Sequence, residues 1–202
     1  MGEGPAREGA RDQLPLLTVD MDGVICRPIL GQNIGIHRDL LDPEASPKPA
    51  KLYPRWLNAS LDHLRFNFRR PIDGARDAIA DLHRVRRLVL LTGRRTTPDG
   101  WLARHGFEGL FDELVINDTD QRSPHYKLEV VRRLGADEHV DDDGRTVQLL
   151  ADLTDVRLFL CDWPRNRGLP LDERIVRVQG IRDLARRLLA EHARLDGEHA
   201  AQ

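Results

Sequence analysis

The sequence predicts an α/β protein built on a doubly wound parallel sheet, with a small insert after the first strand. Two observations predict this fold. Short apolar runs, too brief for helices, alternate with helical segments over most of the chain, from Leu14 to about Leu189. Strands that alternate with helices form parallel sheets with helices on both faces. The 202 residues also suffice for one substantial core with a small insert.

Composition favours a soluble globular protein and argues against several other classes. Charged residues make up 32% of the chain, hydrophobic residues make up 40%, and 31 Lys and Arg nearly balance 33 Asp and Glu. We therefore expect neither a nucleic-acid polymer nor a membrane as partner, and no apolar run approaches the length of a membrane span. Cys26 and Cys161 form no Cys-x-x-Cys metal site, so we expect reduced thiols and a cytoplasmic location. The oligomeric state stays open.

The amino-terminal third contains one strand and the insert. Residues 1–13 are rich in Gly, Ala, Arg and Glu, which indicates a tail without regular structure. The run Leu16-Leu-Thr-Val19 predicts the first strand of a core formed by residues 14–24 and 72–195. Residues 25–71 contain five prolines before Pro71, so we expect mainly loop, with one helix over 57–68. This insert is basic and aromatic, which suits either an anionic, ring-bearing substrate or a solvated loop with a small satellite core.

From Pro71 onward, the expected elements alternate regularly. Helices are expected at 71–85, which carries an apolar stripe, and at 98–105, 123–134, 145–153 and 181–195, followed by a polar tail at 196–202. In the helix at 123–134, we expect Ser123 as the cap and Pro124 as the first helical residue. Strands are expected at 88–92, 113–118, 138–143, 156–161 and 174–178.

Polar residues gather where the expected strands end. Asp20 and Asp22 follow the first strand, Thr92 and Gly93 end the second, and the acids Asp141, Asp142 and Asp143 end the fourth. In a doubly wound sheet these ends meet at the edge where ligands bind. Carboxylates suit a hard cation such as Mg²⁺, and a Thr hydroxyl followed by turn N–H groups suits phosphate oxygens. On its own, Asp-x-Asp-Gly fits an ordinary turn as well as it fits a binding site, so the choice between the two depends on the motifs elsewhere in the chain.

Lys127 is the most informative single residue. It lies near the start of the helix that Ser123-Pro124 opens, where a cation opposes the helix dipole by a few tenths of a kcal/mol. The helix gains nothing from this placement, whereas an anion-binding site would. The alternative is a surface lysine whose ammonium group reaches away into solvent.

This set of motifs resembles the haloacid dehalogenase (HAD) superfamily. The matching motifs are Asp20-Met-Asp-Gly-Val24, Leu91-Thr-Gly-Arg94, Lys127 and His139-Val-Asp-Asp-Asp143, in the family's order. The resemblance implies a phosphomonoester hydrolase in which Asp20 attacks phosphorus, Asp22 shuttles the proton, and Thr92, Gly93 and Lys127 hold the phosphoryl oxygens. It also implies Mg²⁺ held by the Asp20 side chain, the Asp22 backbone carbonyl and a carboxylate of the acidic run. In members of the family whose strand ends in Asp-Asp, the second aspartate is the usual metal ligand. This implies Asp142 here, with Asp141 or Asp143 as alternatives.

The resemblance also bears on the substrate, which we expect to be a small phosphorylated molecule. Residues 25–71 occupy the place of the superfamily's small cap, which closes over the site. Ser123–Lys127, His139–Val147 and Asp162–Arg167 look like the 5′-nucleotidase branch, which acts on deoxyribonucleotides, whereas a sugar or cofactor phosphate is the alternative. A response-regulator receiver domain fits poorly, because its phosphorylated Asp would lie on the third strand, before Thr and Lys. A catalytically idle phosphate-binding scaffold is the remaining alternative. Substrate identity and the specificity residues of the cap stay open.

Overall fold

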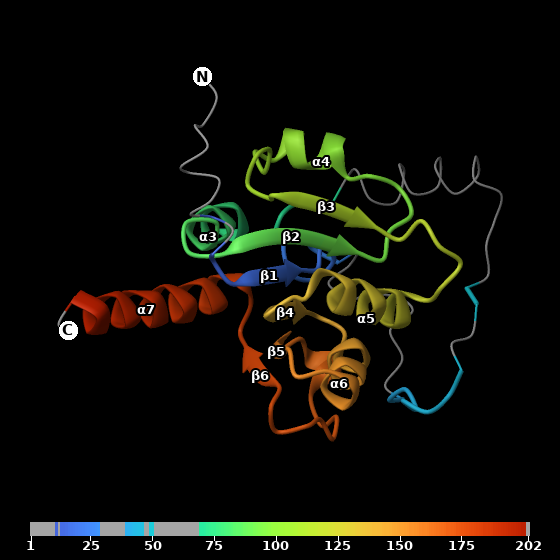
Figure 1. Cartoon of the computed structure of the whole chain (residues 1–202). Helices are drawn as coiled ribbons and strands as arrows, with labels where there is room; N and C mark the ends of the chain where they lie inside the picture. Colours follow the sequence, from blue (N-terminus) through green and yellow to red (C-terminus); the bar gives the residue numbers. More distant parts are fainter. Residues whose placement is uncertain (1–10, 12, 29–38, 47–48, 51–68, 201–202) are drawn as a thin grey trace.

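A computed structural model of the chain describes residue 11 and residues 13–28, 39–46, 49–50 and 69–200 (Figure 1). Within these residues a six-stranded sheet has the order β3-β2-β1-β4-β5-β6, and each neighbouring pair is parallel. The strands are β1 (Leu16–Val19), β2 (Arg87–Thr92), β3 (Glu113–Ile116), β4 (Glu138–Asp141), β5 (Arg157–Cys161) and β6 (Val176–Val178). The doubly wound parallel sheet that the sequence predicts is confirmed.

Helices cover both faces of this sheet. They are α3 (Ala75–Leu82), α4 (Asp99–Arg104), α5 (Ser123–Leu134), α6 (Gly144–Leu153) and α7 (Ile181–Ala200), with a short 3₁₀ turn, η2 (Pro164–Asn166). Helix α3 packs against α7 on one face, and α5 packs against α6 on the other (Figure 1). No helix in the described part of the chain is both long enough and apolar enough to span a membrane.

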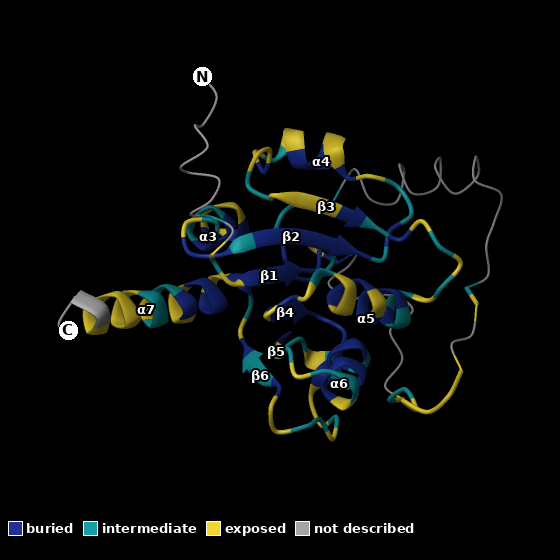
Figure 2. Ribbon diagram, viewed as in Figure 1, coloured by how far each residue is buried: buried dark blue, intermediate teal, exposed yellow. Residues whose placement is uncertain are grey.

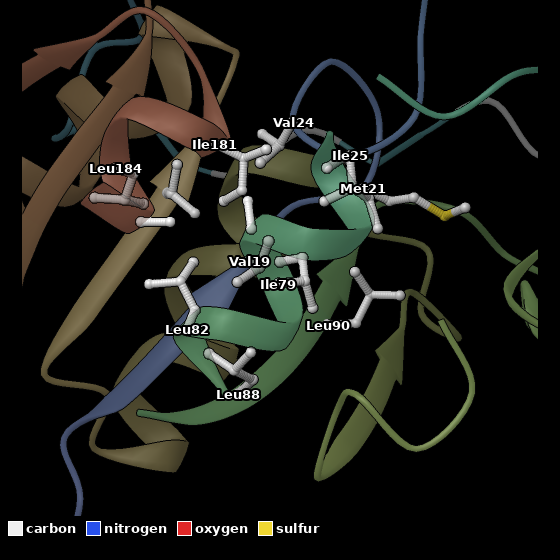
Figure 3. Packing of buried hydrophobic residues seen from close by; sticks show 14 of the residues in the cluster. Val19, Met21, Val24, Ile25, Ile79, Leu82, Leu88, Leu90, Ile181 and Leu184 are labelled. Carbon is white, nitrogen blue, oxygen red and sulfur yellow. The ribbon is translucent and has the colours of Figure 1, made fainter. Parts of the chain in front are cut away.

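The alternation of side chains along the strands divides the core into two apolar clusters. Leu17, Val19, Leu88 and Leu90 face α3 and α7, as Figure 3 shows for Val19, Leu88 and Leu90. Their strand neighbours, such as Leu91, belong to the other cluster, with residues of α5 and α6. Both faces of the central strands are therefore buried (Figure 2), which explains their continuous apolar runs in the sequence.

Two helix ends differ from expectation. Ser123 lies inside α5, and the residue at the cap position is Arg122, whose side chain makes no capping hydrogen bond. The hydroxyl of Ser123 instead lies close to Gly93, at the end of β2. Helix α7 continues to Ala200, beyond the expected end near Leu195, and Nε2 of His192 lies 3.3 Å from Oδ2 of Asp196, one turn further along the helix.

The two ends of the insert are joined to each other beside β1. Cys26 and Pro71 are paired as an isolated antiparallel β-bridge. On either side of it, Arg27 N–H donates to the Arg70 carbonyl (2.9 Å), and Ile72 N–H donates to the Ile25 carbonyl (2.8 Å). Within the insert, Ala50 N–H donates to the Asp120 carbonyl (2.7 Å), in the loop before α5. The expected helix over 57–68 lies outside the described residues.

Candidate active site

The candidate site lies at the carboxyl ends of β1 and β4. The strand order runs from β1 toward β2 and β3 on one side and toward β4, β5 and β6 on the other, so β1 and β4 flank the switch point. Doubly wound sheets bind ligands at this position. Asp20 directly follows β1, and its N–H donates to the Val140 carbonyl of β4 (3.0 Å). The carboxylate at the end of β1 is therefore fixed next to the acidic run at the end of β4.

Three buried carboxylates meet there. Oxygen atoms of Asp20, Asp141 and Asp142 lie within 4.8 Å of one another, and each residue is at most 4% exposed. Lys127 reaches them from α5, with its Nζ 2.7 Å from Oδ1 of Asp20 and 2.7 Å from Oδ2 of Asp141. The side chain of Lys127 is itself 4% exposed, which rules out the alternative of a solvated surface lysine.

The three consecutive acids have different surroundings. The Asp141 carboxylate accepts from Lys127 and His139 on Oδ2 and from the N–H groups of Asp142 and Asp143 on Oδ1. Asp143 caps α6, because its Oδ1 accepts from Arg145 N–H (3.0 Å), and it also pairs with the Arg145 guanidinium. Asp142 faces the guanidinium of Arg165, which belongs to η2. Both carboxylate oxygens of Asp141 thus accept hydrogen bonds from neighbouring residues of the core, and the Asp143 carboxylate binds Arg145 in the first turn of α6.

His139 connects the site to β1. It is fully buried, its Nδ1 lies 2.8 Å from Oγ1 of Thr18, and its Nε2 lies 3.2 Å from Oδ2 of Asp141. Burial holds the pKa of His139 below its ordinary value despite the hydrogen bond with Asp141. The neutral ring then donates from Nε2 to Asp141, because the opposite tautomer would place two acceptors together.

Burial and neighbouring charges separate the pKa values of the cluster. Burial raises the pKa of Asp20 to about 7, although the positive charge of Lys127 opposes this shift. Burial, together with the negative charge of Asp20, raises the pKa of Asp142 well above its usual range. Burial also opposes ionisation of Asp141, but Lys127 and His139 outweigh it and hold the pKa of that carboxyl far below the usual value. Lys127 therefore lies between one carboxyl whose pKa is raised and one whose pKa is lowered.

Asp22 is held by two arginines. Its carboxylate accepts from Nε and Nη2 of Arg94 (2.8 and 2.7 Å) and from Nη1 of Arg69 (2.5 Å). Burial opposes ionisation of Asp22, but the hydrogen bonds and charge of Arg94, with the charge of Arg69, outweigh it and lower the pKa. Trp101 fixes Arg69 in place, because its indole N–H donates to the Arg69 carbonyl (2.8 Å).

Thr92, Gly93 and Gly23 lie in closely packed surroundings at the carboxyl edge of the sheet. Thr92 ends β2 and is 1% exposed, and its hydroxyl accepts from Arg94 N–H (3.2 Å). A Cβ on Gly93 would lie 2.4 Å from the Ser123 hydroxyl, so only glycine fits between β2 and α5. Gly23 has φ +84°, and a Cβ there would lie 1.7 Å from Oδ2 of Asp142. The glycine of Asp-x-Asp-Gly is thus required by both the backbone conformation and the neighbouring carboxylate.

No family model and no curated protein sequence matches this chain. Solved structures do match it over most of its length. D,D-heptose 1,7-bisphosphate phosphatase from B. bronchiseptica, complexed with magnesium and phosphate, has a TM-score of 0.53 and 18% identity over 88% of this chain and 99% of its own. A haloacid dehalogenase-like hydrolase from Xanthomonas campestris has a TM-score of 0.54 and 15% identity over 90% and 98%.

L-2-haloacid dehalogenase from Xanthobacter autotrophicus matches as well, with a TM-score of 0.55 and 15% identity over 86% of this chain and 98% of its own. The chain has the fold of the HAD-like hydrolases. Identities at this level establish the fold alone, and the HAD-like fold accommodates both phosphatases and dehalogenases among these structures.

The residues of this site fit a divalent cation. Asp20, Asp141 and Asp142 offer only oxygen donors, which hard cations such as Mg²⁺ prefer. Lys127 and Arg165 bring two positive charges to three buried carboxylates, which leaves an imbalance of negative charge. An added cation would remove this imbalance.

Sequence reasoning assigned no role to four residues that the fold brings into the site. Arg94 had a visible signal, because it directly follows Thr92-Gly93, and Arg165 lies in the Asp162–Arg167 stretch that marked the nucleotidase resemblance. His139 opens the acidic motif, and its ring contacts Asp141 two residues later. Arg69 carries no local signal, since only the return of the insert to the core places it at Asp22.

Proposed function

We propose that this HAD-like protein is a Mg²⁺-dependent phosphomonoester hydrolase that works through an aspartyl-phosphate. The observation that carries the proposal is the contact of Lys127 with Asp20 inside a buried acidic cluster at the switch point of the sheet. Lys127 neutralises part of the negative charge that would otherwise repel a phosphate dianion from an aspartate nucleophile. A receiver-like arrangement is not favoured, because the candidate nucleophile follows the first strand.

Asp20 is the proposed nucleophile. One of its carboxylate oxygens forms a bond to phosphorus while the bond from phosphorus to the ester oxygen breaks, and the leaving oxygen takes a proton. Water then attacks the phosphorus of the acyl phosphate and regenerates the carboxylate of Asp20. Thr92 and the N–H groups at Gly93 hold the phosphoryl oxygens, and Lys127 offsets the charge that develops on them.

Asp22 is the proposed acid and base. Its carboxylate is ionised in the substrate-free protein, because Arg94 and Arg69 lower its pKa, and this state suits the activation of water in the second step. The first step needs the protonated form. A bound phosphate dianion raises the pKa of a nearby carboxyl by like-charge repulsion and offers the two arginines another acceptor, so substrate binding favours the protonated state that the leaving group requires.

The Asp20 and Asp142 carboxylates and the Asp22 backbone carbonyl would hold Mg²⁺. Asp142 is chosen because Asp141 accepts four hydrogen bonds within the fold and Asp143 caps α6. When bound, the ion supplies positive charge that orients the phosphate and reduces its repulsion from Asp20.

Residues 25–71 are proposed to act as the cap that sets substrate preference. Two contacts support this assignment. Arg69, where the chain returns from the insert, contacts Asp22, and Ala50 pairs with the loop before α5 at the same edge of the sheet. We propose a nucleoside 5′-monophosphate as substrate, with sugar and cofactor phosphates as the alternatives.

Hydrolysis of a generic aryl phosphate tests the phosphatase assignment. We expect turnover that requires Mg²⁺ and disappears in Asp20→Asn, because an amide cannot form the acyl phosphate. Asp118→Asn is the matched control, since Asp118 is exposed in the loop after β3 and should retain full activity. Turnover that survives in Asp20→Asn would show that another group attacks phosphorus.

Mg²⁺ titration of activity tests the metal assignment. We expect Asp142→Asn to need a much higher Mg²⁺ concentration for half-maximal rate, because it removes one anionic ligand. The same shift in Asp143→Asn instead would transfer the ligand role to Asp143. A screen of nucleoside, sugar and cofactor monophosphates then tests the substrate, and no preference for 5′-nucleotides would eliminate that refinement alone.

A further inference from the structure

Arg165 lies against the carboxylate that the proposed metal ion would need. Its Nη2 donates to Oδ2 of Asp142 and to the Asp142 backbone carbonyl (3.0 Å). Asp142 is 2% exposed and lies within the three-carboxylate cluster. In this conformation a guanidinium supplies the positive charge at Asp142 that a divalent cation would otherwise supply.

The backbone around Arg165 is firmly anchored. The Trp163 indole N–H donates to the Gly23 carbonyl (2.8 Å), which ties η2 to the loop after β1. The amide of Asn166 donates to the carbonyls of Asp142 (2.9 Å) and Cys161 (3.1 Å). These contacts hold the Cα of Arg165 next to Asp142, so the guanidinium is present at high local concentration.

The side chain of Arg165 is less firmly held than its backbone. The side chain is 17% exposed, and the guanidinium carbon Cζ lies 5.6 Å from the centre of the Trp163 ring. Its Nε is buried and makes no hydrogen bond with the described residues. A buried donor without an acceptor is unfavourable, so rotation of Arg165 toward solvent recovers a hydrogen bond to water.

A guanidinium held against the Asp142 carboxylate opposes the binding of a metal ion there. Both are cations that take lone pairs of the same carboxylate, and their mutual repulsion is strong in a buried site. We propose that Arg165 competes with the divalent cation for Asp142 and thereby sets the metal affinity of the site. This inference rests on the proposed function, because it requires the metal site described above. Arg165 and the ion are thus alternative partners of the Asp142 carboxylate, and the guanidinium moves away when the ion binds.

Isothermal titration of the metal-free full-length chain with Mg²⁺ alone tests the proposal without any turnover. We expect Arg165→Gln to bind Mg²⁺ about tenfold more tightly than the native chain, because the apparent dissociation constant varies inversely with the competent fraction of the protein. Arg165→Lys should fall between the two, since it keeps the charge but loses the planar fork. Arg145→Gln is the matched control and should leave affinity unchanged, because Arg145 pairs with Asp143.

Thermal unfolding supplies a second measurement. Without metal, Arg165→Gln should unfold at a lower temperature than the native chain, because it leaves Asp142 without its cation, and added Mg²⁺ should raise its unfolding temperature by more. Circular dichroism before titration checks that each variant is folded. If Arg165→Gln fails to fold, Arg165→Lys carries the test.

The outcomes separate this inference from the proposed function. Equal Mg²⁺ affinity in the native chain and both Arg165 variants would overturn the competition and leave the phosphatase assignment intact. Weaker binding in the variants would overturn it as well, and would mean that Arg165 supports the ligand. No Mg²⁺ binding by any of the proteins would remove the metal from the proposed function and overturn the inference with it.

Discussion

The two acids of the Asp-x-Asp motif differ in pKa because their neighbours differ. Asp20 and Asp22 lie two positions apart, yet burial raises the pKa of one to about 7, while Arg94 and Arg69 lower the pKa of the other against the effect of burial. Paired carboxyls with opposite shifts are the usual arrangement where two acids have different tasks. Without substrate or cation these directions are opposite to those that a nucleophile at Asp20 and an acid at Asp22 need, so the proposed roles require a bound cation to lower the pKa of Asp20 and a bound phosphate to raise that of Asp22.

The raised pKa values of Asp20 and Asp142 make the metal-free protein sensitive to pH. Between the ordinary pKa near 3.8 and the folded value near 7, the folded state binds more protons at Asp20 than the unfolded state. The contribution of Asp20 to stability therefore falls as pH rises through this window, by up to about 1.4 kcal/mol per pH unit, whereas the lowered pKa of His139 makes an opposite contribution as pH rises toward 6.5. Asp141 has the opposite shift, and its contribution is lost only as pH falls below its ordinary value.

Comparison with a variant isolates the carboxyl contribution in urea unfolding of the metal-free chain. Between pH 5 and pH 7.5 the native chain should lose stability relative to Asp20→Asn, because the variant lacks one of the carboxyls with a raised pKa. Mg²⁺ at pH 7.5 should restore stability in the native chain. An identical pH dependence in the native chain and in Asp20→Asn would contradict the assignment of the raised pKa to Asp20.

Lys127 is expected to be essential for folding as well as for chemistry. Lys127→Met leaves Asp20 and Asp141 buried without their shared cation, and breaking a buried ion pair from one side costs about 3–5 kcal/mol. Arg186→Met provides the comparison, because Arg186 pairs with Asp183 while 77% exposed, and such a pair contributes about 1 kcal/mol or less. Urea unfolding at neutral pH measures both changes.

At the scale of elements, strands and helices were predictable, but some of their ends were not. Continuous apolar runs identified β2 and β5, because both faces of these strands are buried. Ser123 fits the capping pattern locally, but α5 begins one residue earlier than that pattern implies, and Ser123 packs against Gly93 of another element. Tertiary packing therefore overrode the local capping signal.

The loop between β1 and the insert offers a test of close packing. Gly23→Ala meets two obstacles, the positive φ and the Asp142 carboxylate at 1.7 Å, whereas Gly135→Ala meets only a positive φ of +60° with open space around it. We expect Gly135→Ala to lower stability by about 1–2 kcal/mol. Gly23→Ala should lower stability more and should also weaken Mg²⁺ binding. Equal effects of the two substitutions would mean that the loop relaxes away from Asp142.

Across the whole molecule, stability and chemistry lie at opposite ends of β4. At the amino end of the strand, Glu138 is buried and pairs with Arg86 (2.6 Å) and Arg157 (3.2 Å), and Arg157 also pairs with Glu191 of α7 (2.9 Å). At the carboxyl end lies the acidic cluster. The network at the amino end joins the sheet to α7 and contacts none of the candidate catalytic residues.

Glu138→Gln should therefore separate the two properties. We expect a loss of about 3–5 kcal/mol in unfolding free energy, because Arg86 stays buried without its full counter-charge. The catalytic rate per folded molecule should match that of the native chain at 25 °C. A large drop in that rate, with the protein shown to be folded, would mean that the two ends are coupled.

The candidate site was predictable where the chemistry lies in local motifs. Asp20, Thr92, Lys127 and the acidic run follow strand ends or begin a helix, and parallel topology alone brings them to one edge. Arg69 and Arg165 were not predictable, because their contacts with Asp22 and Asp142 depend on how the insert returns and how η2 packs on the loop after β1. Such contacts are set by tertiary structure, which sequence periodicity does not encode.

The junction at Ile25–Arg27 and Arg70–Ile72 has a consequence for how this protein can diversify. The segments that leave and re-enter the core are hydrogen-bonded to each other. The positions of the two chain ends at the sheet are therefore fixed independently of the residues between them. Length and composition can therefore change there at little cost to the core, since loop closure varies only slowly with loop length. The insert can thus vary while the carboxylates that follow β1 and end β4 keep their positions in the core.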